Sequence, residues 1–210
     1  MNSPSSSMGL DNDELVHLAL YAMRNDRHDE AMSLLKRAIE AAPDSAVAHY
    51  LLGAEHAQVG LYDRAAAEIA ESVRLDPRIP AAHFQLGLLH LTAGRTREAE
   101  AAWQPLDQLA TDDPLRLFKS ALLHLVNEER ELCIEELQAG IARNTLNEAL
   151  NDDMRRLLAD LQARQRGTQT RQDTQGADSN RSSSPPQVPI PSKRMLLSTY
   201  DQNPDDTATN

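Results

Sequence analysis

Cysteine and aromatic residues are scarce in this chain. Its 210 residues include one cysteine, Cys133, one Trp, four Tyr and two Phe. A single cysteine cannot form an internal disulfide, which excludes a secreted disulfide scaffold. Runs of Val, Ile and Thr that would mark strands are also lacking. The core must therefore be built from leucine and alanine, and because small side chains let helices approach closely, we expect an all-α fold.

Long apolar runs are missing as well. No stretch approaches the ~18 apolar residues of a membrane-spanning helix, and residues 1–14 lack the basic start and apolar run of a signal peptide. The sequence therefore predicts a cytoplasmic protein without membrane insertion. Its preference for arginine over lysine and its many alanines indicate a GC-rich bacterial genome.

Positive charge is in deficit. The formal net charge is −11, and residues 1–163 hold 15 Lys and Arg against 27 Asp and Glu. Because such an acidic surface repels phosphate backbones, nucleic acid is excluded as a partner. The chain also lacks a glycine-rich phosphate loop and a nucleophile elbow. We therefore expect no enzyme activity, no catalytic residues and no cofactor.

What the sequence does contain is a period of 34 residues. Gly53 recurs as Gly87, Ala65 recurs as Ala99, and Pro43 recurs as Pro77. Ala31 and Cys133 fall in the same small-residue slot as Ala65 and Ala99, one period before and one period after them. A fixed period of this length predicts a stacked array of helix pairs, and such arrays usually bind other proteins.

The period divides the chain into a repeat domain at 11–164 and two polar flanks, 1–10 and 165–210, which are predicted to be disordered. Gly60 and Gly94 each split a unit into two helices, because glycine readily takes the left-handed conformation that ends a helix. Pro105 falls late in a second helix, where we expect a kink or an early end. The expected units are 12–45, 46–79, 80–113, a degenerate unit at 114–145, and an amphipathic capping helix at 147–164.

These units resemble the tetratricopeptide repeat family over about residues 12–145. The second unit supplies the family's residues as Leu52, Gly53, Ala65, Ile69 and Pro77, and the third supplies Leu86, Gly87, Ala99 and Trp103. The first unit has Ala19 in place of the glycine, and the fourth has Thr145 in place of the proline. The resemblance implies a right-handed superhelical array of three to four helix–turn–helix units.

The resemblance also implies a concave groove lined by the first helix of each unit. The groove positions are apolar, so we expect the groove to bind an apolar peptide or helix. An alternative that stays open is that part of this surface is ordinary core between helices. The positions that would grip a terminal carboxylate carry no cation, which excludes the carboxylate-clamp subclass. The expected partner contacts are Val16, Leu20, Tyr50, Leu51, Phe84, Leu88, Phe118 and Leu122.

Histidines also follow the period. His56, His90 and His124 are spaced by 34, as are His49 and His83. Equivalent positions in adjacent repeats should lie about 10 Å apart, whereas zinc ligands must approach the ion to about 2.1 Å. The histidines are therefore interpreted as structural, and no metal site is predicted. Cys133 occupies a buried small-residue slot, so its thiol is expected to be inert.

The C-terminal tail contains one apolar cluster. A proline-rich stretch at 185–191 favours polyproline II, and the cluster that follows lies within 193–202. An apolar cluster in an otherwise polar tail indicates a short motif that becomes ordered on binding a partner. The alternative is that the cluster arose by chance. The motif could also dock into the groove of its own or a neighbouring molecule. Its residues are Lys193, Arg194, Met195, Leu196, Leu197 and Tyr200.

Together these features predict a non-catalytic adaptor or scaffold. Its groove would bind a protein or peptide ligand that has an apolar face, and its tail would recruit a second partner. The alternative is a dedicated chaperone or accessory protein of a bacterial secretion system, which would form a stable equimolar complex with one client.

Overall fold

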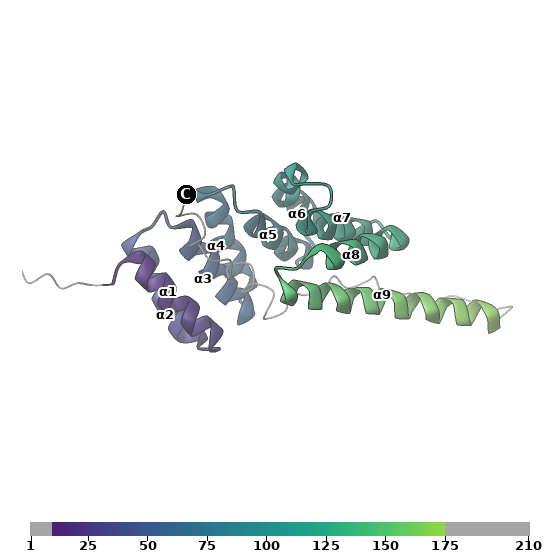
Figure 1. The fold of residues 1–210 in the computed structure, drawn as a ribbon, viewed down its shortest axis with the longest axis horizontal. Coiled ribbons are helices and arrows are strands. Elements are labelled where there is room, and N and C mark those ends of the chain that lie inside the picture. The colour runs from purple at the N-terminus through teal and green to yellow at the C-terminus, as the bar shows by residue number, and fades with distance from the viewer. Residues whose placement is uncertain (1–9, 175–210) are drawn as a thin grey trace, which may run out of the picture. The chain divides into compact units, whose positions relative to one another are not determined.

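The computed structural model describes residues 10–174, with side chains described through residue 165, and every regular element in that part of the chain is helical (Figure 1). The chain divides into two compact units, residues 1–82 and 83–210, with the boundary in the first turn of α5. The elements are α1 (Asn12–Arg24), α2 (His28–Ala41), α3 (Ala46–Gln58), α4 (Tyr62–Leu75), α5 (Pro80–Thr92), α6 (Thr96–Trp103), the 3-10 helix η1 (Gln104–Gln108), α7 (Pro114–Val126), α8 (Arg130–Arg143) and α9 (Glu148–Thr174). In the described part, no helix has the length and apolarity needed to cross a membrane.

The first helix begins at a capping box. The side chain of Asp11 accepts a hydrogen bond of 2.8 Å from the backbone N–H of Glu14, and the Glu14 carboxylate accepts one of 3.0 Å from the backbone N–H of Asp11. Two N–H groups that the helix leaves without partners are thereby satisfied. The first helix of the array therefore begins at Asn12, directly after its cap.

The turns between paired helices share one conformation in all four repeats. Gly60 and Gly94 have φ of 80° and 74°, which confirms the left-handed conformation expected at both glycines. Two residues that are not glycine take the same conformation. Asp26, one period before Gly60, has φ of 55°, and Glu128, one period after Gly94, has φ of 63°. The left-handed conformation therefore depends on the position within the repeat and does not require glycine.

A repeated backbone hydrogen bond closes each of these turns. The N–H of Leu61 donates to the His56 carbonyl at 2.8 Å, and the same bond joins residues 27 and 22, 95 and 90, and 129 and 124. This six-residue closure is the bond that ends a helix with a left-handed residue. Its recurrence in the fourth repeat shows that 114–145 folds like the others although both glycines are missing there.

Small residues on the first helices make room for large side chains of the second helices. A Cβ on Gly53 would lie 2.5 Å from Cγ1 of Ile69 on α4. In unit 2, a Cβ on Gly87 would overlap the indole of Trp103 on α6. The indole N–H of Trp103 donates to the Phe84 carbonyl at 2.8 Å, and the Trp103 ring stacks on the Phe84 ring with centroids 6.1 Å apart. The glycine slot is therefore a packing requirement at both repeats.

The second helix of the third repeat ends early, as Pro105 predicts. Helix α6 stops at Trp103, and η1 begins at Gln104 with the proline in its first turn. Two hydrogen bonds hold this segment against α7. Lys119 donates to the Asp107 carboxylate at 2.5 Å, and Arg116 donates to the Leu109 carbonyl at 2.7 Å.

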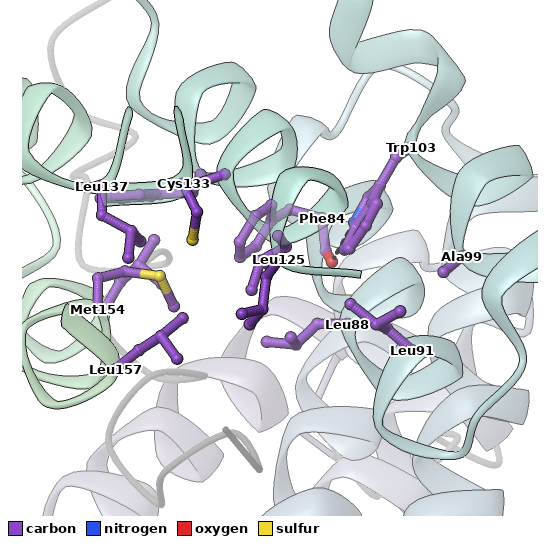
Figure 2. Packing of buried hydrophobic residues seen from close by; sticks show 14 of the residues in the cluster. Phe84, Leu88, Leu91, Ala99, Trp103, Leu125, Cys133, Leu137, Met154 and Leu157 are labelled. Atoms are coloured by element: carbon purple, nitrogen blue, oxygen red, sulfur yellow. Dashed lines mark hydrogen bonds between the residues drawn. The ribbon is translucent and has the colours of Figure 1, made fainter. Parts of the chain in front are cut away.

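The last helix covers the apolar side of the fourth repeat. Leu150, Met154, Leu157 and Leu161 of α9 belong to one buried cluster with Leu125 of α7 and with Cys133 and Leu137 of α8 (Figure 2). The capping role expected for 147–164 is therefore present. The helix continues to Thr174, which corrects the expectation that order ends at 164. The physical reason is that Gly167 disfavours the helix by only ~1 kcal/mol and that no proline lies between Gly167 and Pro185.

An asparagine network fixes where α9 begins. The Asn147 side chain accepts from the N–H of Leu150 at 2.8 Å and so caps the helix. Asn144 and Asn151 exchange hydrogen bonds, because the Asn144 amide donates to the Asn151 side chain at 3.0 Å and the Asn151 amide donates to the Asn144 carbonyl at 2.7 Å. All three residues are buried, so this network orients α9 against the end of α8.

Candidate functional site

The residues expected to line the groove are mostly buried. Of the eight, seven are exposed by no more than 7%, and only Leu20 is partly exposed. In unit 1 the seven include Val16, Tyr50 and Leu51, and in unit 2 they include Phe84, Leu88, Phe118 and Leu122. These seven side chains have little exposed surface in the structure, and their role as partner contacts stays a prediction.

The reason for this burial is clearest in unit 2. Phe84, Leu88, Phe118 and Leu122 all belong to the cluster that α9 completes (Figure 2). A Cβ on Gly140 of α8 would lie 2.5 Å from the Phe118 ring, so the Phe118 ring fills the gap between α7 and α8. The reading of this surface as core between helices, which the sequence left open, holds for these four residues.

Helix α3 in unit 1 is buried all round over its last two turns. Each residue from Tyr50 to Gln58 is buried, and α3 packs on α2 and α4. This stretch includes charged and amide side chains. The Glu55 carboxylate accepts a hydrogen bond of 2.8 Å from Nδ1 of His28 on α2, and burial raises the pKa of the Glu55 carboxyl above its ordinary value. Its second oxygen has no hydrogen-bond partner among the described residues.

Gln58, one turn beyond Glu55, is the more unusual residue. Its side chain is 5% exposed, and neither its amide nitrogen nor its amide oxygen finds a partner within residues 10–165. A buried polar group without a hydrogen bond costs about 1–3 kcal/mol, a cost that a water or a ligand with both a donor and an acceptor would offset. A peptide group, with one N–H and one C=O, has that complement.

Directly after Gln58 the chain exposes three large apolar side chains. Val59, Leu61 and Tyr62 are each 41% exposed, and we call them the turn patch. In the other repeats, the positions equivalent to Val59 and Leu61 are Asn25 and Arg27, Ala93 and Arg95, and Asn127 and Glu129. The α3–α4 turn is therefore apolar where the other turns are mostly polar. Alignment of the repeats reveals this difference, but the expected groove residues did not include it.

The repeated histidines make hydrogen bonds inside the array. Nδ1 of His49 bonds to the Glu68 carboxylate at 2.7 Å, and Nδ1 of His83, one period later, bonds to the Ala102 carbonyl at 3.1 Å. Burial lowers the pKa of His56 and of His90, which favours their neutral forms. Across the described residues, no group of three or more His, Cys, Asp or Glu side chains is placed to hold a metal ion.

Cys133 is fully buried within the unit 2 cluster. Burial, together with the smaller effect of the nearby Glu136 charge, raises the pKa of its thiol to about 11. A thiol that is buried and protonated at neutral pH cannot act as a nucleophile. The tail residues Lys193, Arg194, Met195, Leu196, Leu197 and Tyr200 lie outside the described residues.

Comparison with protein families agrees with this architecture. Two tetratricopeptide repeat family models match the chain, one over residues 12–54 and the other over residues 50–114. No curated protein matches the sequence. Residues 12–114 therefore belong to the tetratricopeptide repeat family, a fold that serves as a protein–protein interaction module.

Proposed function

We propose that this chain is a non-catalytic adaptor that binds an extended polypeptide segment at the α3–α4 turn. The observation that carries the proposal is the combination of the turn patch with the unpartnered amide of Gln58 beside it. A ligand side chain would rest on Val59, Leu61 and Tyr62, and the Gln58 side chain, which is 5% exposed, would rotate toward the ligand so that its amide bonds to the ligand backbone. Apolar contact then supplies affinity, and the amide fixes the direction and register of the segment.

The other turns support this choice by contrast. Polar residues in a turn keep it solvated, and they are the ordinary choice at the surface of a repeat array. The three neighbouring apolar side chains are each 41% exposed. When a partner covers them, the burial of their apolar surface stabilises the complex by about 25 cal/mol per Å². Tyr62 adds an aromatic ring with a hydroxyl, the kind of side chain that is enriched at binding hot spots.

The test is a pull-down from the native host followed by mass spectrometry. The full chain is compared with Val59→Ser/Leu61→Ser and with a matched control, Leu132→Ser, whose parent leucine is 47% exposed on α8. The expected result is a partner that the full chain and the control recover and that the turn-patch variant loses. Calorimetry with a peptide from that partner should then show at least 10-fold weaker binding to Gln58→Leu, since this change keeps the size of the side chain and removes the amide.

The same experiment separates the adaptor from the alternative secretion chaperone. An adaptor should recover two partners, one of which is lost when Leu196 and Leu197 in the tail motif are changed to serine. A chaperone should recover one abundant client in an equimolar complex that is unaffected by the tail variant. If the turn-patch variant recovers the same proteins as the full chain, the proposed site is wrong.

A further inference from the structure

The first helix of the array has an exposed face that the later repeats bury. Leu18 is 43% exposed, whereas the residues one and two periods later, Leu52 and Leu86, are 3% and 7% exposed. Tyr21 is 61% exposed, whereas its equivalents Glu55 and Leu89 are 0% and 2% exposed. The side chains at these two repeat positions are thus buried in the second and third repeats and exposed in the first. Glu14 and His17 complete this surface, which we call the α1 face.

The second repeat shows what normally covers this face. Helix α3 packs on α2 of the preceding repeat, and the link between Glu55 and His28 joins the position equivalent to Tyr21 to that helix. No repeat precedes α1 in the described part of the chain. The α1 face therefore has the chemistry of a helix-packing surface, with apolar residues at the centre and a shallow hollow beside Leu10 and Leu18.

The order of charge along α1 indicates which helix could cover it. Asp11, Asp13 and Glu14 lie at the start of the helix, whereas Arg24 and Arg27 lie at or just beyond its end. Asp13 and Arg24 are separated by about 16 Å along the helix axis, and their midpoint lies beside Leu18. A second α1 running antiparallel about a two-fold axis at Leu18 brings each Asp13 opposite Arg24 of the second copy.

We propose that two copies of this chain associate through their α1 faces in an antiparallel, two-fold arrangement. Leu18 and Tyr21 of both copies form the centre, where the Arg27 guanidinium of the same chain lies 5.1 Å from the Tyr21 ring, and unlike charges meet at both ends of the paired helices. A two-fold interface must be self-complementary, which the acidic start and basic end of α1 satisfy. A parallel pair would instead place like charges together at each end.

The expected association is weak. One helix of 13 residues gives a contact about 20 Å long, which is smaller than a standard interface of about 800 Å² per partner. We therefore expect a dissociation constant of about 10–500 µM. This surface is separate from the turn patch, so it can be tested without knowing the partner proposed above.

The first test is sedimentation velocity of the full chain between 10 µM and about 1 mM. A shift from monomer to dimer with concentration is expected, and Leu18→Glu should weaken dimerisation at least 10-fold. The matched control is Leu132→Glu, from a leucine that is 47% exposed, and it should leave dimerisation unchanged. A wild-type chain that stays monomeric at the highest concentration overturns the proposal, as do larger assemblies or an equal effect of the control.

A charge exchange tests the antiparallel order. Asp13→Arg alone and Arg24→Asp alone should each weaken the dimer, because each creates like-charge contacts at both ends. The double variant should restore the dissociation constant to within about 2-fold, since it exchanges the two charges and keeps them complementary. Failure of the double variant to recover overturns the antiparallel arrangement.

Cross-linking gives a test that does not depend on removing an interaction. Cys133 is buried, so it contributes little background to thiol oxidation. Under mild oxidation Leu18→Cys should form a disulfide-linked dimer across the two-fold axis at least 10-fold faster than Leu132→Cys, whose position is equally exposed. Equal rates for the two variants contradict the proposal, and circular dichroism should confirm that each variant retains its helical content.

Discussion

Replacing Gly87 by alanine tests the packing that defines the third repeat. The added Cβ would overlap the indole of Trp103, which is 0% exposed and fixed by its hydrogen bond to the Phe84 carbonyl. Because Trp103 also stacks on the Phe84 ring, it cannot rotate away without giving up both contacts. The substitution must therefore move α6 away from α5 or displace the indole.

The expected cost can be worked from these contacts. Overpacking a core costs about 1–3 kcal/mol, and losing the buried indole hydrogen bond costs a further 1–3 kcal/mol. Alanine recovers about 1 kcal/mol because its helix propensity exceeds that of glycine. We expect Gly87→Ala to lower the free energy of unfolding by about 1–5 kcal/mol.

The measurement is urea unfolding followed by circular dichroism, combined with a double-mutant cycle. Trp103→Phe shortens the side chain that meets the new Cβ, so Gly87→Ala should cost at least about 1 kcal/mol less in the Trp103→Phe background. Trp103 is the only tryptophan in the chain, so its fluorescence reports the same transition in Gly87→Ala. A cost below about 0.5 kcal/mol, or costs that are equal in the two backgrounds, would refute the reasoning.

Three further predictions follow from single sites. Glu128 has φ of 63°, so Glu128→Gly should raise the free energy of unfolding by about 0.5–1 kcal/mol in urea titrations, and a loss of stability would contradict the assigned turn. Burial raises the pKa of Glu55, so this carboxyl favours folding below its unfolded pKa and that contribution is lost as pH rises through the raised pKa. The stability of Glu55→Gln relative to wild type should therefore increase from pH 4 to pH 8, and a difference that does not change with pH would contradict this. Burial raises the pKa of the Cys133 thiol to about 11, so a thiol reagent at pH 8 should react with the folded chain at least about 100-fold more slowly than with the urea-unfolded chain.

The turns show how the sequence predicts the fold. Glycine at 60 and 94 predicted two left-handed turns, and the structure confirms both. It adds the same turn at Asp26 and Glu128, where no residue type signals it. Packing of the flanking helices and the repeated closing hydrogen bond impose the conformation there, at a local cost of about 1–2 kcal/mol.

The expected groove shows what sequence reasoning leaves open. Periodicity places Phe84 and Phe118 on one side of their helices, but it does not say whether that side meets solvent or another helix. In the structure, α9 and the close approach of Gly140 complete a core around Phe118. Both contacts depend on where separate helices pack, which a repeat alignment does not encode.

The residues that differ between repeats indicate a function more clearly than the residues that recur in them. Residues that recur every 34 positions, such as Gly53 and Gly87, are explained by the side chains they accommodate. The turn patch breaks the pattern in residue type, because apolar residues replace mostly polar ones at a solvated turn. Leu18 has the same residue type as its equivalents in the next two repeats but is exposed where they are buried, because no repeat that would cover it is present among the described residues. Neighbouring exposed apolar side chains mark interaction surfaces, whereas a single one such as Leu132 needs no partner, so the turn patch and the α1 face are where binding should be sought first.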